Sequence, residues 1–168
     1  MQDKIKRWRE DLDTISGMLE YQEQVLENGP HYEWDESFSK AVSYKIGEAA
    51  KSVVLARMWM GEFLAYFSNS PYAQNDGSRE SVKDIVPTAD VGEEKEFMPE
   101  SEDIMVSFMD DIREDLRDAN RAFHTELTNL EGYPMLPTAN IYQHLTEGRM
   151  WLGQALGAIR KYHEHVEN

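Results

Sequence analysis

Apolar side chains recur at every third or fourth residue along four long segments of this 168-residue chain. From Ile5 to Leu26 steps of three and four alternate strictly, which gives an amphipathic helix a narrow apolar seam. The other three segments keep one face apolar in the same way, so we predict an all-α protein. The seam positions are Ile5, Trp8, Leu12, Ile15, Leu19, Gln22 and Leu26; Phe38, Val42, Ala49, Val53, Ala56, Met60, Phe63 and Phe67; Met105, Phe108, Ile112, Leu116, Ala119, Phe123, Leu127 and Leu130; and Ile141, Leu145, Gly148, Leu152, Ala155, Ile159, Tyr162 and Val166.

Helix-breaking residues divide the chain into two helical hairpins, residues 1–68 and 101–168. Residues 69–100 contain proline, glycine and an acidic run but no helical period, so we interpret them as a linker. Within it, Val82–Val86 is a candidate short strand or flap. We expect two antiparallel hairpins packed as a four-helix assembly. The boundary signals are Asn28-Gly29-Pro30, a start near Ser37, Ser68-Asn69-Ser70-Pro71, a start at Ser101, the residues Gly132, Pro134 and Pro137, and a start near Thr138.

Composition restricts the function classes. The chain has 32 acidic and 17 basic side chains, a formal net charge of -15 and no cysteine. This excludes a disulfide scaffold and a thiolate zinc site, and it disfavours broad contact with nucleic acids or anionic membranes. The charged start of the chain and the lack of a long apolar run predict a soluble, cytoplasmic protein, in the host cytoplasm if the chain is viral. A small anionic ligand in a local basic pocket remains compatible with this charge.

One sequence repeat links the two hairpins. Residues 56–65 read ARMWMGEFLA and residues 148–157 read GRMWLGQALG, so Arg, Met, Trp, Gly and Leu coincide at an offset of 92. Both copies lie on the second helix of their hairpin. We infer duplication of a hairpin and a pseudo-twofold arrangement, like a homodimer fused into one chain.

The repeat has a structural and a functional interpretation. Arg57 and Gly61 share one face of a helix, as do Arg149 and Gly153. In the structural interpretation the glycines allow close helix crossing and the tryptophans fill the core. In the functional one the two arginines are equivalent, flank a cleft between the hairpins and hold an anion, with aromatic rings available to stack on a base.

The repeat also carries a resemblance to a known family. Residues 145–157, LTEGRMWLGQALG, and more loosely residues 49–61, AAKSVVLARMWMG, resemble the second helix of small phage helical-hairpin proteins that include anti-CBASS and anti-Thoeris sponges. The resemblance implies a phage protein that sequesters a cyclic nucleotide immune signal without cleaving it, and that forms homo-oligomers. This chain departs from the family's single hairpins by carrying two hairpins and a long acidic linker.

A sponge needs recognition groups rather than catalytic ones. Guanidinium and ammonium groups bind phosphates, and aromatic faces bind bases. We therefore predict one strip of ligand-binding residues on each repeat-bearing helix, with no catalytic residue, no metal site and no cofactor. The predicted ligand-binding residues are Arg57, Lys51 and Tyr44 on one helix and Arg149, His144 and Tyr142 on the other.

A metal-dependent nucleotide hydrolase is a less favoured alternative. It requires carboxylates that converge on Mg²⁺ from one-turn pairs. Such pairs exist, but those of the third helix alternate with arginines, which is typical of an exposed ion-paired face. The histidines give no convincing metal site, since His163 and His165 point to different sides and His144-x-x-Glu147 lacks further ligands. The carboxylates are Glu20 and Glu23 on the first helix, and Asp110, Asp111, Glu114, Asp115 and Asp118, alternating with Arg113, Arg117 and Arg121, on the third.

Other interpretations stay open. The net charge of -15 also suits an acidic protein-binding inhibitor or DNA mimic of phage origin, whose carboxylates would occupy a partner's phosphate-binding surface. The complex of such a mimic would weaken steeply as salt rises. A purely structural phage protein is a further possibility.

Overall fold

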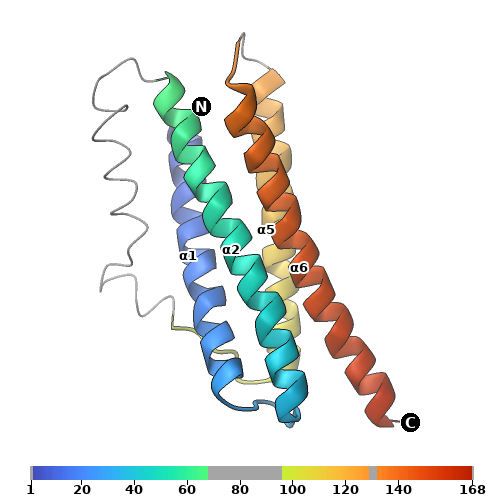
Figure 1. Ribbon diagram of the computed structural model, residues 1–168. Coiled ribbons are helices and arrows are strands. Elements are labelled where there is room, and N and C mark those ends of the chain that lie inside the picture. The colour runs from blue at the N-terminus through green and yellow to red at the C-terminus, as the bar shows by residue number, and fades with distance from the viewer. Residues whose placement is uncertain (1, 68–95, 129–131, 168) are drawn as a thin grey trace.

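The computed structural model describes residues 2–67, 96–128 and 132–167, and in this part of the chain the secondary structure is helical (Figure 1). The predicted all-α, four-helix fold is confirmed. The candidate strand Val82–Val86 and most of the predicted linker lie outside the described residues. The four helices are α1 (Gln2–Asn28), α2 (Glu36–Phe67), α5 (Glu102–Thr128) and α6 (Met135–Glu167).

Three helix starts show how local chemistry sets the boundaries. Asp35, rather than the expected Ser37, caps α2, because its Oδ1 accepts the Phe38 N–H at 2.7 Å. Ser101 caps α5 as expected, with its Oγ accepting the Ile104 N–H at 3.3 Å. The fourth helix begins at Met135, before the expected start near Thr138. Proline is tolerated in a first helical turn because the N–H it lacks would have no partner there.

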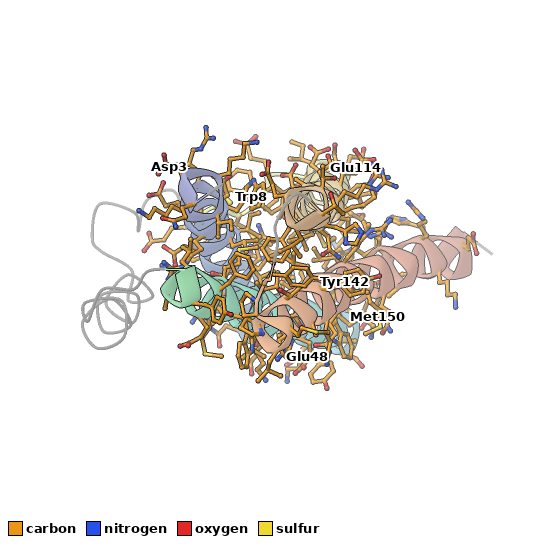
Figure 2. All side chains as sticks on the ribbon, turned by 90° about the horizontal axis from the view of Figure 1, so that it is seen from above. Asp3, Trp8, Glu48, Glu114, Tyr142 and Met150 are labelled. Carbon is orange, nitrogen blue, oxygen red and sulfur yellow. The ribbon has the colours of Figure 1, made fainter. Side chains whose placement is uncertain are left out.

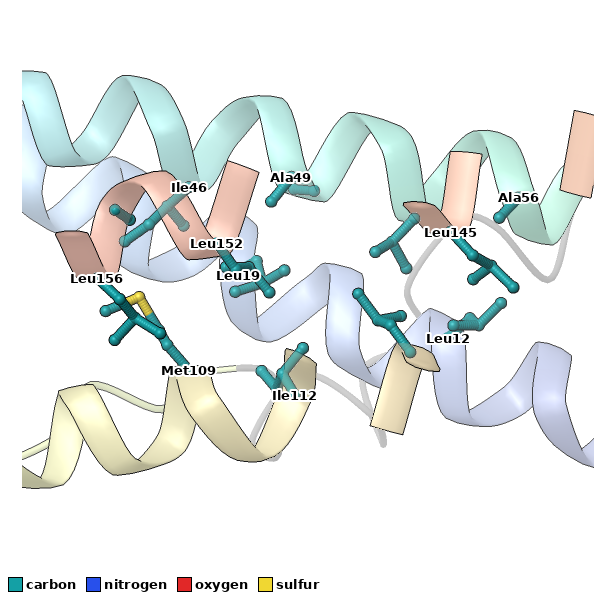
Figure 3. Packing of buried hydrophobic residues seen from close by; sticks show 14 of the residues in the cluster. Leu12, Leu19, Ile46, Ala49, Ala56, Met109, Ile112, Leu145, Leu152 and Leu156 are labelled. Atoms are coloured by element: carbon teal, nitrogen blue, oxygen red, sulfur yellow. The ribbon is translucent and has the colours of Figure 1, made fainter. Parts of the chain in front are cut away.

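The predicted apolar seams form the core. Almost every described seam position is buried or partly buried, and the buried apolar residues of all four helices belong to one continuous cluster (Figure 3). The fully buried aliphatic side chains include Leu19 from α1, Ile46 from α2, Leu116 from α5 and Leu152 from α6. Because both hairpins contribute to one core, their mutual packing is part of the folded structure.

Helices α2 and α6 are the inner pair of this arrangement. They run antiparallel, since Phe38 stacks on Tyr162 at a ring distance of 4.1 Å while Ala49 lies beside Gly148, where an added Cβ would sit 3.7 Å from the Ala49 main-chain oxygen. Helix α1 packs on α2 and α5 packs on α6 (Figures 1 and 2). The two repeat-bearing helices therefore face each other, as the predicted pseudo-twofold duplication requires.

The outer pair, α1 and α5, meets mainly through long side chains. Trp8 packs edge-on against Phe123 with ring centroids 6.4 Å apart, and the Lys4 Nζ lies 2.6 Å from the Glu126 Oε1. Large aromatic rings lie between α1 and α5, whereas α2 and α6 pack closely against each other. The molecule thus has an α1/α5 layer and an α2/α6 layer.

The loop between α1 and α2 ties both hairpins together at one end of the bundle. Tyr32 and Glu33 adopt positive φ values of 61° and 66°, and the Tyr32 hydroxyl donates a hydrogen bond to the Pro99 main-chain oxygen. Burial and, second, the Glu102 carboxylate raise the pKa of Tyr32 to about 12. Residues 96–100, which we expected to belong to the linker, therefore dock on this end, where the Gln22 side-chain amide also donates to the Phe97 main-chain oxygen at 3.3 Å.

Candidate anion-binding site

Arg57 lies inside the first hairpin, between α1 and α2. Its Nε donates a hydrogen bond to the Arg9 main-chain oxygen at 3.2 Å, and the Arg9 Nε donates to the Arg57 main-chain oxygen at 3.4 Å. The Asp13 Oδ1 lies 4.0 Å from the Arg57 Nε and supplies the opposite charge. Only 4% of Arg57 is exposed. Main-chain oxygens and the Asp13 carboxylate surround Arg9 and Arg57, so this arginine pair has a structural role.

Gly61 gives this pair its space. A Cβ at position 61 would lie 3.2 Å from the Arg9 Nη2 and 3.4 Å from its Cζ. The Arg9 guanidinium therefore covers the surface of α2 that the missing side chain leaves open. The expected close approach at this glycine is made by an arginine side chain rather than by a helix backbone.

A second repeat, which our sequence interpretation missed, makes the same arrangement in the other hairpin. Residues 9–12 and 113–116 both read Arg-Glu-Asp-Leu, at an offset of 104. Arg113 lies over Gly153 as Arg9 lies over Gly61, because a Cβ at position 153 would be 3.3 Å from the Arg113 Nη2 and 3.4 Å from its Cζ. Each hairpin thus places the arginine of one repeat on the glycine of the other.

The two copies differ at their remaining positions. Counting from the paired motifs, Arg149 corresponds to Arg57 and Arg117 corresponds to Asp13. The second hairpin therefore has a cation where the first has its carboxylate. Arg149 is exposed, and within the described part of the chain its guanidinium has neither a hydrogen bond nor an ion pair. We use the name arginine groove for Arg113, Arg117 and Arg149, which the paired motifs place along the junction of α5 with α6.

The groove is only weakly neutralised by the chain itself. The Arg113 Nη1 lies 3.5 Å from the Asp110 Oδ1, and the Arg117 Nε lies 3.6 Å from the Asp118 Oδ1. The Nε atoms of Arg113 and Arg117 are nevertheless buried without a hydrogen-bond partner among the described groups. Long ion pairs between exposed side chains on one helix contribute little. Arg149, which is exposed, is therefore the arginine of this group whose planar guanidinium is presented to solvent.

Helix α5 separates its charges by side. Burial, then the carboxylates of Asp111, Asp118 and Asp11, the last of these on α1, raise the pKa of the Asp115 carboxyl. Arg113 and Arg117 instead lie on the side of α6. The ion-paired face that we expected is present in part, because Asp110 and Asp118 pair with Arg113 and Arg117, whereas Asp115 lies near Asp11 of α1.

The predicted ligand-binding residues lie in three separate places. The expectation that Arg57 and Arg149 are equivalent contacts beside one cleft is wrong, because the Arg9 main chain and Asp13 enclose Arg57 within its own hairpin. Arg149 and Tyr142 are seven residues apart, on one side of α6, and both are exposed. The 60% exposed Tyr142 ring lies along the outside of this helix (Figure 2).

Tyr44 and Lys51 occupy the outer side of α2. The Tyr44 ring packs edge-on against Trp151 at 5.9 Å, and the Lys51 Nζ pairs with the Glu48 Oε1 at 3.2 Å, which raises the pKa of Lys51. His144, on α6, is partly buried next to this side of α2. Its Nδ1 lies 3.3 Å from the Glu147 Oε2. These three residues do not join the arginine groove.

Other titratable clusters do not assemble a metal site. Among the described residues, no group of His, Asp and Glu side chains is arranged to hold a metal ion. His163 does acquire an acidic partner, because its Nε2 lies 2.5 Å from the Glu102 Oε1, which also accepts the Trp34 indole N–H at 3.1 Å. This cluster joins α6 to α5 and to the loop before α2.

No described helix has the length and apolar character that a membrane span requires. Comparisons with protein-family models, with curated proteins and with solved structures find no match to this chain. The functional argument therefore depends on the geometry of the two hairpins.

Proposed function

We propose that this protein binds and sequesters a nucleotide-type anion in the arginine groove without cleaving it, as a phage anti-defence sponge does. The observation that carries the proposal is the exchange of Asp13 for Arg117 between two otherwise matching arginine–glycine sites. In the first hairpin the Asp13 carboxylate lies near Arg57. In the second hairpin an external phosphate would take the place of that carboxylate.

The neighbouring side chains suit such a ligand. Arginine forks bind phosphate oxygens through two parallel N–H donors. Tyr142 offers an exposed aromatic face two helical turns from Arg149, where a base can stack. The Asn120 side-chain amide and the Thr146 hydroxyl, 3.4 Å apart, bridge α5 and α6 between these two residues and offer polar groups for a base or sugar edge.

Thermal unfolding against cyclic dinucleotides, cyclic trinucleotides and cyclised ADP-ribose isomers tests this function. A ligand at 100 times its Kd adds about 2.7 kcal/mol, which for a chain of this size raises the unfolding midpoint by about 5–10 °C. The ligand is then recovered by denaturation and identified by chromatography. Intact recovery is expected, whereas conversion would indicate an enzyme and the absence of any shift would reject the nucleotide proposal.

Three variants locate the site. Arg117→Asp places in the second hairpin the carboxylate that Asp13 provides in the first, so we expect binding to be lost while the fold is retained. Arg149→Ala should weaken binding about tenfold, the effect of one charge-assisted hydrogen bond. Lys51→Ala removes a cation from the outer side of α2 and should bind normally. Loss of binding in Lys51→Ala alone would move the site to the strip that also contains Tyr44.

The charge of the α1/α5 layer supports a second candidate function. Helices α1 and α5 together contain 15 acidic and 7 basic residues, a net charge of -8. An acidic inhibitor or DNA mimic would use this layer against a basic protein surface. Its complex with a DNA-binding protein should weaken steeply between low and physiological salt. Failure to retain any such protein at low salt would dismiss this candidate.

A further inference from the structure

The charges of the bundle are segregated along its long axis. The start of α1 lies beside the end of α5, where the Lys4 Nζ pairs with the Glu126 Oε1, and the start of α6 lies at the same end (Figure 1). We call this the N-terminal end of the bundle. Its described residues contain 5 basic and 4 acidic side chains, a net charge of +1, whereas those of the opposite end contain 4 basic and 13 acidic ones, a net charge of -9. The residues counted are 2–10, 58–67, 119–128 and 132–141 for the N-terminal end, and 20–45, 96–110 and 157–167 for the opposite end.

The N-terminal end also exposes apolar side chains. Met135 and Leu136, in the first turn of α6, are 76% and 66% exposed, more than any other large apolar side chain among the described residues. Tyr133, just before this turn, is 39% exposed. Residues 132–143 contain no charged side chain, although 29% of the residues of the chain are charged. This turn therefore presents a compact apolar tip, and a lipid surface can receive such protruding side chains without a preformed pocket.

Two cations lie near this tip, in the first two turns of α1. Lys6 and Arg7 are exposed, and within the described part of the chain neither has an ion pair. Long basic side chains can hold their charged groups at lipid phosphates while neighbouring apolar side chains enter the acyl region. An apolar tip flanked by such cations is typical of proteins that lie on an anionic lipid surface.

The acidic end lies too far away to cancel this attraction. Helix α1 has 27 residues, which corresponds to about 40 Å. The Debye length at physiological salt is about 8 Å, so about five Debye lengths separate the opposite end from a surface that touches the N-terminal end. The net charge of -15 thus opposes broad contact with an anionic membrane but permits contact through this one end.

We propose that the N-terminal end of the bundle docks on an anionic lipid surface, with Met135 and Leu136 inserted at the acyl boundary and with Lys6 and Arg7 at the lipid phosphates. Docking of this kind requires no membrane-spanning helix. The inference does not depend on the proposed nucleotide ligand, because none of these four residues belongs to the arginine groove.

Co-sedimentation of the full chain with lipid vesicles tests the proposal. Vesicles of phosphatidylcholine with about 30% phosphatidylglycerol should bind the protein at least tenfold more tightly than vesicles of phosphatidylcholine alone, because each basic residue at an anionic surface contributes about fivefold. Raising NaCl from about 50 to about 500 mM should weaken this binding severalfold, because salt screens the attraction. Equal binding to both kinds of vesicle, or no binding to the anionic vesicles, would overturn the proposal.

A matched pair of double variants locates the contact. Lys6→Gln with Arg7→Gln should weaken binding to anionic vesicles about 25-fold, about fivefold for each cation. Arg160→Gln with Lys161→Gln also removes two adjacent exposed cations, but at the opposite end, and should bind like the wild type. Equal weakening in the two double variants would show that net charge determines binding, and it would overturn docking through the N-terminal end.

Insertion of the apolar tip has a separate readout. The chain contains no cysteine, so Met135→Cys can be labelled at a single position with an environment-sensitive fluorophore. Its emission should shift to shorter wavelength on anionic vesicles, whereas the same label on Met150→Cys, a 46% exposed position in the middle of α6, should not respond. A shift at both positions, or at neither, would contradict insertion of the tip. Circular dichroism of each variant verifies that the helices are retained.

Discussion

Arg57 and Arg149 occupy the same position of a duplicated motif, yet one is a buried structural residue and the other is an exposed candidate ligand contact. Both hairpins lay an arginine from their first helix over a glycine of their second. The difference arises four residues after that arginine, where Asp13 stands in one copy and Arg117 in the other. The Asp13 carboxylate allows Arg57 to be enclosed, because a buried cation needs an opposite charge. In the second copy Arg117 is a third cation beside Arg113 and Arg149, so no carboxylate stands at that position to balance their charge.

This comparison shows how a duplicated arrangement can place corresponding arginines in different environments. The first copy stabilises the contact of α1 with α2 through reciprocal arginine-to-main-chain hydrogen bonds. The second copy keeps the same packing of Arg113 on Gly153, and both copies contain buried arginine nitrogens without a hydrogen-bond partner among the described groups, Arg57 Nη1 in the first and the Nε atoms of Arg113 and Arg117 in the second. The two copies therefore differ in the exposure of their second-helix arginine, since Arg57 is buried and Arg149 is exposed.

The largest expected effect on stability comes from removing the second-helix arginine of each copy, Arg57 or Arg149. Arg57→Ala should lower the free energy of unfolding by about 3 kcal/mol, because it removes the buried donor to the Arg9 main-chain oxygen and the cation beside Asp13. Arg149→Ala should change it by less than about 0.5 kcal/mol, since the side chain is exposed. Urea denaturation of both variants measures the two values.

The Arg57→Ala, Asp13→Ala double variant is the control for the charge pair. Its loss of stability should be smaller than the sum of the two single losses, because each single change already removes the interaction between the Arg57 and Asp13 side chains. Equal losses in Arg57→Ala and Arg149→Ala would show that the two copies are equivalent after all.

Alanine at the two glycines should give effects of opposite sign. Alanine is favoured over glycine inside a helix by about 1 kcal/mol. At position 61 this gain should be outweighed, giving a net loss of about 1 kcal/mol, because the new Cβ displaces Arg9 and breaks its hydrogen bond to Arg57. At position 153 the Arg113 side chain can move in the open groove, so the variant should gain about 0.5 kcal/mol.

Thermal or urea unfolding distinguishes these two outcomes, and Gly153→Ala should also weaken binding of any groove ligand by shifting Arg113. A loss of stability in both variants would mean that the second site is as tightly closed as the first.

The smallest expected effect concerns the acidic junction of α5 with α1. Burial and neighbouring carboxylates raise the folded-state pKa of Asp115 above its ordinary value of 3.8. The stability linked to this group is therefore present below that ordinary value and is lost as pH rises through the raised pKa. Asp115→Asn should thus stabilise the protein at pH 7 by about 0.5 kcal/mol, a small gain because solvent screens the site.

This gain should disappear as pH falls and wild-type Asp115 takes up its proton. Urea denaturation of wild type and variant at neutral and acidic pH measures the difference. A gain that is independent of pH would assign the effect to packing instead of charge.

Much of the fold could be predicted from local patterns. The apolar period defined the four helices and nearly all of their buried positions, because a helix with one apolar stripe has a single favourable way to face a core. The repeat at an offset of 92 predicted a pseudo-twofold arrangement of the two hairpins, and the structure adds that α2 packs against α6. Helix starts were less predictable, since Asp35 and Ser37 are both chemically suitable caps for α2 and only the backbone geometry selects Asp35.

The site was only partly predictable. Arg149 and Tyr142 were predicted from the sequence and stay predictions as ligand contacts. Arg113 and Arg117 were not proposed as ligand-binding residues, because their repeat lies at an offset of 104 and a comparison at one fixed offset does not connect it with the first. The distance from arginine to glycine along the chain differs as well, 52 residues from Arg9 to Gly61 and 40 from Arg113 to Gly153. The Arg-Glu-Asp-Leu identity was the signal that could have revealed the site.

The sequence by itself determined the helices, their apolar seams and the duplication, because each depends on the spacing of residues within about two helical turns. Only the tertiary structure decided which arginines are enclosed and which remain open. That outcome depends on the register at which α1 meets α2 and α5 meets α6, which places Asp13 near Arg57 and Arg113 over Gly153. Contacts between residues 40 or more positions apart leave no periodic trace in the sequence, since charge and packing across the helix interface fix them.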